Sequence, residues 1–212
     1  MKLVVFDFDG TLMDNETIDE LAAAYSINDE VSLITKEAME GKIDFFSALT
    51  KRVALLKGMP LSLATKVAHS LTPMPNAKEC IDRLKEAGFI VVCFSGGFSL
   101  ATEYFKEVLG LDATFSNILH AKDCVLTGQV GGSMMFSDSK GVMLKSFASM
   151  LGLSKSDCIA IGDGANDLSM FEYADTRIAF CAKPKLKEKA THIVDTKDLG
   201  LIADIVLQET KC

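Results

Sequence analysis

The sequence predicts an α/β protein: a three-layer α/β/α sandwich with a mostly parallel, Rossmann-like sheet, an inserted helical-bundle cap and a small β-hairpin flap. Along most of the chain, short and nearly all-apolar runs alternate with helical segments. This alternation is typical of parallel strands that helices cover on both faces. One block after the first apolar run contains only helical patterns, which predicts an insertion.

Apolar runs are the predicted strands, and helical segments separate or follow them. The first of these helices is followed by Gly88, a residue type that favours the left-handed conformation at a helix C-terminus. The predicted strands are residues 2–8, 90–95, 158–162, 177–181 and 192–194. The predicted helices of the core are residues 75–87, 98–109, 139–151, 165–173, 184–189 and 199–208.

Two insertions interrupt this predicted core, which comprises residues 1–13 and 72–212. Residues 14–71 are the predicted cap, because glycine and proline divide them into helical segments without any strand-like run. A shorter insertion, residues 117–136, is the predicted flap, and its VLTGQVGG stretch predicts a hairpin with a glycine-containing turn. The predicted cap helices are residues 15–25, 29–39, 43–57 and 61–71.

Composition narrows the possible functions. The 212 residues are 49% hydrophobic, enough for a full core, and carry a formal net charge of −7. Since no cluster of Lys or Arg stands out, nucleic acid is not an expected partner, whereas a small anionic substrate is compatible. No apolar stretch reaches the roughly 20 residues of a membrane span, and the N-terminal run is too short for a secretion signal. The six cysteines form no CxxC pair, which predicts free thiols in a cytoplasmic protein.

The first candidate motif is FDFDGTL, which begins at Phe6. An apolar strand ends there in Asp7 and Asp9, and the chain must turn at Gly10, so both carboxylates are expected at the carboxyl end of the strand. Two acids so close repel each other unless a cation lies between them or one is protonated. The motif therefore predicts a functional site, although a solvated strand end followed by a glycine turn could have the same sequence.

The second candidate motif is CFSGGF, in which a predicted strand ends at Ser95 and two glycines lead into a helix. The Ser95 hydroxyl and the unobstructed amides of Gly96 and Gly97 would form an anion site at the helix N-terminus. An ordinary turn between a strand and a helix also uses glycine for its geometry, so this motif alone leaves both interpretations open.

The third candidate motif is IGDGANDLSMF, where another strand runs through a glycine turn into a helix. Asp163 lies at the turn, and Asn166 and Asp167 follow at positions that can face the same point above the sheet. A further carboxylate at a strand end suits Mg²⁺, which prefers oxygen ligands, although Asp163 could simply cap the helix. Lys140 opens another predicted helix, an unfavourable place for a cation unless it faces an anion.

These motifs occur in an order that resembles the haloacid dehalogenase-like phosphatase superfamily, and the resemblance covers essentially the whole chain. It implies that Asp7 is a nucleophile that becomes an aspartyl-phosphate, and that Asp9 is the general acid and base. It also implies one Mg²⁺ ion, held by Asp7, the backbone carbonyl of Asp9 and Asp163. The phosphoryl group would be bound by Ser95, the amide of Gly96, Lys140 and Asn166.

The predicted cap is similar to that of phosphoserine phosphatases in the stretches NETIDELA and ITKEAMEGKIDF and in the arginine of KRVALL, and AFCAKP in the core is similar too. This resemblance implies hydrolysis of phospho-L-serine, the last step of serine biosynthesis. Arg52 would bind the substrate carboxylate and Glu16 its ammonium. Met39 and Phe45 would close an apolar lid, with Asp167 in a supporting role.

Several points stay open at this stage. Within residues 43–57, the helical spacing puts Phe46 on the core face and Arg52 on a flanking stripe, where it could equally be a solvated charge. Gly10 is a departure, since phosphoserine phosphatases often carry Ser there. Three rival functions remain: transfer of the phosphoryl group to an alcohol such as homoserine, hydrolysis of another small phosphomonoester, and a non-catalytic phospho-acceptor switch. The expected assembly is a monomer or a homodimer.

Overall fold

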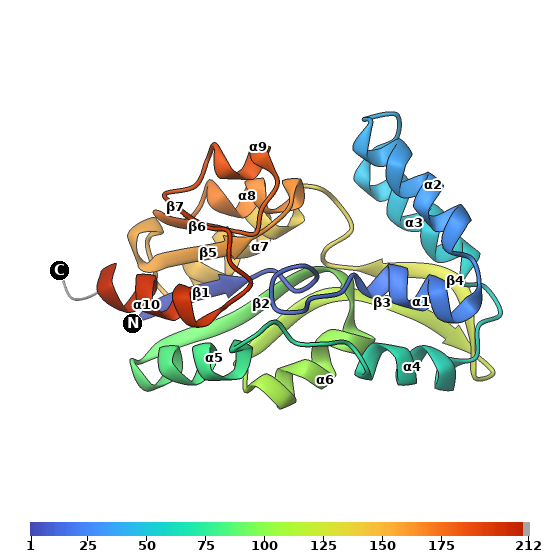
Figure 1. Ribbon diagram of the computed structural model, residues 1–212, viewed down its shortest axis with the longest axis horizontal. Coiled ribbons are helices and arrows are strands. Elements are labelled where there is room, and N and C mark those ends of the chain that lie inside the picture. The colour runs from blue at the N-terminus through green and yellow to red at the C-terminus, as the bar shows by residue number, and fades with distance from the viewer. Residues whose placement is uncertain (210–212) are drawn as a thin grey trace.

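A seven-stranded sheet forms the centre of the protein, in the order β4-β3-β2-β1-β5-β6-β7 (Figure 1). The structure is a computed structural model, and it describes residues 1–209. Every neighbouring pair is parallel except β3 and β4, which are antiparallel. The strands are β1 (Lys2–Phe6), β2 (Phe89–Phe98), β3 (Ala113–Lys122), β4 (Val125–Gly132), β5 (Cys158–Gly162), β6 (Thr176–Phe180) and β7 (His192–Val194).

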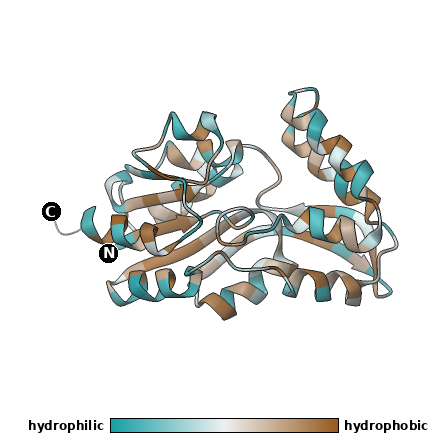
Figure 2. Ribbon diagram, viewed as in Figure 1, coloured by the Kyte–Doolittle hydropathy of each residue, from teal (hydrophilic) through white to brown (hydrophobic). Residues whose placement is uncertain are grey.

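Helices cover both faces of this sheet, which confirms the predicted three-layer α/β class. In β1, Val4 and Phe6 pack on one face, while Leu3 and Val5 pack on the other. Figure 2 shows the resulting hydrophobic strands in the middle of the molecule. The first face is covered by α5 (Ala77–Glu86), α6 (Ser99–Leu109) and α10 (Gly200–Glu209), and the second by α7 (Ser139–Met150), α8 (Leu168–Phe171) and α9 (Pro184–Lys187).

The all-apolar runs became strands close to the predicted positions, and the differences have local causes. Strand β2 continues past Ser95 to Phe98, so its glycines lie in the strand rather than in a turn. The predicted helix 165–173 is a 3₁₀ turn, Ala165–Asp167, followed by the short helix α8. A short 3₁₀ turn, Lys155–Asp157, also precedes β5.

The predicted flap hairpin was misplaced. Its turn lies at Asp123 and Cys124, whose φ angles are 52° and 63°, and the VLTGQVGG stretch is only its second strand, β4. Two central residues with positive φ suit a tight hairpin turn. The first strand, β3, begins at Ala113 and pairs with β2. Sequence reasoning missed it because polar residues interrupt ATFSNILHAK, in which only two of the ten residues are buried.

Four helices lie between β1 and α5 and form the lobe predicted as the cap (Figure 1). They are α1 (Thr17–Tyr25), α2 (Asn28–Met39), α3 (Phe45–Leu55) and α4 (Leu61–His69). The two chain segments that lead into and out of this lobe run side by side. The Asp14 amide donates to the Thr72 carbonyl at 2.9 Å, and the Met74 amide donates to the Leu12 carbonyl at 2.8 Å.

The helical lobe shares its hydrophobic core with the β3–β4 hairpin. Leu119 and Leu126 of the hairpin, and Met135 just after it, belong to the same buried cluster as apolar residues of α1 and α3. The lobe also hydrogen-bonds with β4, because the Gly58 amide donates to the Leu126 carbonyl and the Leu126 amide donates to the Met59 carbonyl, both at 2.8 Å. The hairpin and the lobe are therefore packed as one body.

Two predictions concern the wider character of the chain. Within residues 1–209, none of the helices is both long enough and apolar enough to span a bilayer. The five cysteines in this range are free, as predicted, and Cys212 lies outside the described residues.

Candidate active site

A cavity of about 430 Å³ lies between the carboxyl ends of β1, β2 and β5 and the helical lobe. Parallel strands place the residues that follow them at one edge of the sheet, which is where open α/β sheets bind ligands. Most of the predicted site residues line this cavity: Asp7, Asp9, Glu16, Met39, Phe45, Arg52, Gly96, Asp163 and Asn166. The remaining predicted residues, Ser95, Lys140 and Asp167, are buried.

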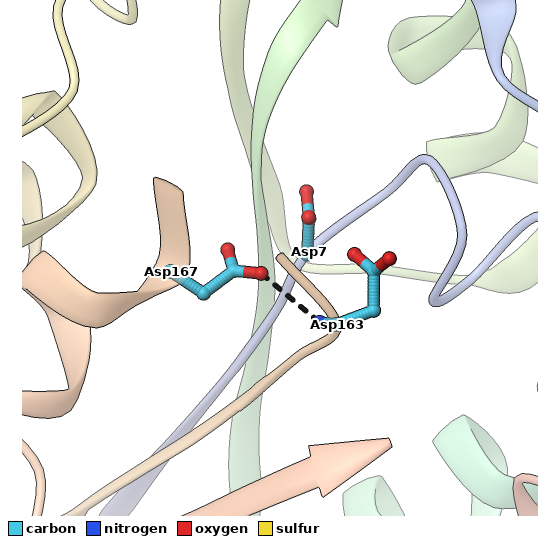
Figure 3. Close-up of side chains that lie close together, drawn as sticks. All are labelled: Asp7, Asp163 and Asp167. Carbon is cyan, nitrogen blue, oxygen red and sulfur yellow. Dashed lines mark hydrogen bonds between the residues drawn. The ribbon is translucent and has the colours of Figure 1, made fainter. Parts of the chain in front are cut away.

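Three carboxylates meet at the bottom of the cavity (Figure 3). Oxygen atoms of Asp7, Asp163 and Asp167 all lie within 4.8 Å of one another. The Asp7 amide continues the pairing of β1 with β5 by donating to the Ile161 carbonyl at 2.9 Å. The Asp167 carboxylate fills the space above Gly162, where a Cβ atom would lie only 2.3 Å from it. Glycine at that position therefore allows the cluster to form.

Lys140 is the buried cation of this cluster. Its Nζ lies 2.5 Å from Asp7 Oδ1 and 2.6 Å from Asp167 Oδ1, and its side chain is almost completely buried. The other oxygen of Asp167 accepts hydrogen bonds from the amides of Asp163 and Gly164, both at 3.0 Å. Asp167 is thus fully engaged within the protein, while Asp7 and Asp163 face the cavity.

The electrostatics of the cluster show an excess of negative charge. Burial, and then the charge of Asp167, raise the pKa of Asp7 well above its ordinary value, and the same two causes raise the pKa of Asp163 to about 6. Burial alone lowers the pKa of Lys140, but the carboxylates of Asp167 and Asp7 outweigh it and raise this pKa. A hard divalent cation between Asp7 and Asp163 would relieve the repulsion, and such ions prefer carboxylate oxygen and water as ligands. These residues fit a Mg²⁺ ion.

Asp9 is held away from this cluster by the start of α1. Its Oδ1 accepts hydrogen bonds from the Thr17 amide at 2.8 Å and from the Thr17 hydroxyl at 2.5 Å. Burial raises the pKa of Asp9, and the two bonds from Thr17 partly oppose this by stabilising the carboxylate. Thr17 therefore fixes the orientation of Asp9, which lines the same cavity as Asp7.

The end of β2 forms the wall beside Asp7 and Asp9. The prediction of two unobstructed glycine amides is wrong for Gly97, whose amide donates to the buried Ser95 hydroxyl at 2.9 Å. The Gly96 carbonyl accepts from Asn117 Nδ2 at 3.1 Å, which ties this wall to β3. Above it lies Phe45, since a Cβ atom on Gly96 would come within 3.0 Å of the Phe45 ring.

The side of the cavity formed by the helical lobe carries charges of both signs. Burial lowers the pKa of Arg52, and the nearby carboxylates of Asp19 and Glu16 oppose that shift. Burial, and then the charges of Asp9 and Asp163, raise the pKa of Glu16 to about 8. Arg52 itself donates from Nε to the Ala48 carbonyl at 3.3 Å, which leaves the rest of its guanidinium available to a ligand.

Apolar groups close part of the cavity, in an arrangement that differs from the predicted helix faces. Phe46 was predicted on the core face of α3, but it is exposed and stacks on Phe136 with ring centroids 5.3 Å apart. Phe45 lines the cavity as predicted. Met39 also lines it, although its side chain is 69% exposed and packs little in this arrangement of the lobe.

Sequence reasoning missed four residues that shape the site. Asp19 and Lys183 line the cavity, and Thr17 and Asn117 hold Asp9 and Gly96. Two of them had a signal: Lys183 follows a predicted strand, and Asp19 lies one helical turn after Glu16. Thr17 and Asn117 act through contacts with other segments of the chain, and the periodicity of a sequence does not reveal such contacts.

Comparisons with known proteins agree with this fold and this site. Residues 1–175 match the model of the haloacid dehalogenase-like hydrolases. The phosphoserine phosphatase of Wolinella succinogenes is 57% identical over 199 residues, which cover 94% of this chain and 97% of that protein. The phosphoserine phosphatase of Methanocaldococcus jannaschii is 49% identical over 198 residues, covering 93% of this chain and 94% of the relative.

Solved structures of phosphoserine phosphatases are also similar to this chain. A phospho-aspartyl intermediate analogue of phosphoserine phosphatase has a TM-score of 0.91 and 48% identity, and the match covers 96% of this chain and 98% of that one. A substrate-bound phosphoserine phosphatase complex has the same TM-score of 0.91 and 48% identity, covering 96% and 97% of the two chains. The chain therefore belongs to the phosphoserine phosphatases of the haloacid dehalogenase-like hydrolase family.

Proposed function

We propose that this chain hydrolyses phospho-L-serine to L-serine and phosphate, with Asp7 as the nucleophile, in the cytoplasm and as the last step of serine biosynthesis. The observation that carries the proposal is that two sets of charged residues lie around the same cavity. The acid cluster with Lys140 lies at the bottom, and Arg52 with Glu16 lies on the side of the helical lobe. Phosphoserine carries a phosphate at one end and a carboxylate and an ammonium at the other.

In the first half of the reaction, Asp7 attacks phosphorus as the bond to the serine oxygen breaks. Asp7 Oδ1 is engaged by the Phe8 amide at 2.6 Å and by Lys140, which supports Oδ2 as the attacking atom. Asp9 gives its proton to the serine oxygen, a poor leaving group that needs this help. The products of this step are free serine and an aspartyl-phosphate on Asp7.

In the second half, a water molecule attacks the aspartyl-phosphate and Asp9 takes the proton of that water. The bond between phosphorus and Asp7 breaks, which restores the carboxylate and releases phosphate. Ser95, the Gly96 amide, Lys140 and Asn166 are proposed to bind the phosphoryl oxygens. When bound by Asp7, Asp163 and the Asp9 carbonyl, Mg²⁺ would neutralise the repulsion between the nucleophile and the phosphate dianion.

Recognition of the amino acid is assigned to the helical lobe. Arg52 would bind the α-carboxylate, since a guanidinium can donate two parallel hydrogen bonds to it. Glu16 would bind the α-ammonium. Phe45, together with Met39 after a closing movement, would exclude water from the reacting groups.

A panel of phosphomonoesters tests this proposal directly. Phosphate release is measured for phosphoserine, phosphoethanolamine, 3-phosphoglycerate and p-nitrophenyl phosphate, in Mg²⁺ and in EDTA. The expected result is strong preference for phosphoserine, loss of turnover in EDTA and its recovery with Mg²⁺. Undiminished turnover by Asp7→Asn would rule out the proposed mechanism, and phosphohomoserine formed in the presence of homoserine would reveal transfer instead of hydrolysis.

A further inference from the structure

Helix α1 begins against a carboxylate that comes from a different segment. The residue before the helix, Glu16, makes no capping bond with its side chain. The amide and the hydroxyl of Thr17, the first helical residue, both donate to Asp9 Oδ1, at 2.8 Å and 2.5 Å. Since the first amides of a helix lack partners within the helix, Asp9 satisfies α1 in the way that an N-cap side chain usually does.

The two oxygens of the Asp9 carboxyl group are consequently not equivalent. Oδ1 is engaged twice by Thr17, which is only 1% exposed, so solvent has little access to these bonds. Oδ2 points toward the wall formed by the end of β2, because a Cβ atom on Gly97 would lie 2.6 Å from it. Gly97 itself lines the cavity. The contact with Thr17 thus fixes one oxygen and leaves the other toward the substrate space.

We propose that Thr17 is a positioning residue of the reaction, which anchors Asp9 Oδ1 so that Oδ2 exchanges the proton. This inference rests on the proposed hydrolysis of phosphoserine. As the bond between phosphorus and the serine oxygen breaks, its electron pair takes the proton of Oδ2 and leaves Asp9 as a carboxylate. As water attacks the aspartyl-phosphate, Oδ2 takes one proton from it and becomes ready for the next cycle.

A purely structural role for the same contact makes a different prediction. If Asp9 only caps α1, loss of the Thr17 hydroxyl lowers the stability of the lobe and affects all substrates alike. If Thr17 positions the proton donor, the loss depends on the leaving group. A serine alkoxide needs a proton as it leaves, whereas p-nitrophenolate is a much better leaving group and needs little help.

The test is Thr17→Val, which keeps the branched shape and the amide but removes the hydroxyl. A hydrogen bond to a charged group is worth enough to change an equilibrium by about 10-fold or more, so kcat for phosphoserine should fall by about that factor. KM for phosphoserine should change little, because Thr17 is not proposed to touch the substrate. Formation of the phosphoenzyme from p-nitrophenyl phosphate should be nearly unaffected, and Thr17→Ser should restore turnover of phosphoserine.

Thr102→Val is the matched control, since Thr102 is fully buried in α6, shares a 2.9 Å hydrogen bond with Ser116 and does not line the cavity. Thr102→Val should leave the turnover of phosphoserine and phosphoenzyme formation from p-nitrophenyl phosphate unchanged. Thermal unfolding of each variant identifies an assay temperature at which all of them are folded. Equal loss for both substrates, no loss or a gain with Thr17→Val, or no rescue by Thr17→Ser would overturn the inference. Failure of the proposed function would be distinct, because the wild-type protein itself would then not hydrolyse phosphoserine.

Discussion

Replacing Lys140 by Met should destabilise the metal-free protein strongly at pH 8. Lys140 lies 2.5 Å from Asp7 and 2.6 Å from Asp167, and all three side chains are at most 5% exposed. Removing one partner of a buried ion pair typically costs about 3–5 kcal/mol, because the remaining charge is left without compensation. The free energy of unfolding, measured by urea titration in EDTA, should fall by about this amount.

The pH dependence of the Lys140→Met effect identifies its cause. Burial already raises the pKa of Asp7, and a proton bound there replaces part of the missing positive charge. The loss of stability should therefore shrink as the pH falls from 8 toward 5, and added Mg²⁺ should also recover part of it. Lys145→Met is the control, since Lys145 is exposed on the same helix and its Nζ lies over the Tyr173 ring, 5.7 Å from the ring centroid. A loss below about 1 kcal/mol, or one independent of pH, would refute the reasoning.

Three further expectations concern charged groups that line the cavity. Arg52→Ala should lower kcat/KM for phosphoserine by about 10- to 150-fold and spare p-nitrophenyl phosphate, which has no carboxylate; equal losses for both would assign the arginine another role. Asp9→Asn should slow turnover of phosphoserine by about 100-fold or more, and rapid-quench measurement should find phosphoenzyme formation from p-nitrophenyl phosphate less affected. Burial raises the pKa of Glu16 from 4.5 to about 8, so the folded state binds this proton more tightly than the unfolded state does. The metal-free wild type should therefore lose stability relative to Glu16→Gln as the pH rises from 4.5 to 8. After solvent screening, the expected difference in the free energy of unfolding is about 1 kcal/mol. Urea titrations of the two proteins measure this difference, and a difference that does not change with pH would contradict the expectation.

The parts of the site at strand ends could be predicted because their signal is local. The apolar runs before Asp7 and Asp163 mark strands that are buried on both faces, and β1 and β5 are parallel neighbours. Their carboxyl ends must then lie at the same edge of the sheet. The sequence pattern therefore predicts that both aspartates lie at one edge of the sheet, and the pairing of β1 with β5 brings them together.

Features that depend on packing between segments had no such signal. Strand β3 alternates irregularly between buried and exposed residues, and therefore lacks the continuous apolar run that identified β1. Phe46 matches the spacing of the α3 core face, but its ring stacks on Phe136 outside the helical lobe. Thr17 looks like an ordinary first residue of a helix until Asp9 is placed beside it. In each case a tertiary contact overrides or supplements what the local pattern indicates.

The bonding of the helical lobe to β4 has a consequence for recombination between members of this family. A chimera that exchanges residues 14–71 alone would place a foreign chain against an edge strand that is hydrogen-bonded to Gly58 and Met59. It would also separate Leu119 and Leu126 from the apolar side chains that they pack against. An edge strand left with unmatched partners is a site of misassembly. Exchanges that transfer residues 113–136 together with 14–71 should therefore yield folded hybrids. Each hybrid should have the substrate preference of the protein from which both segments were taken.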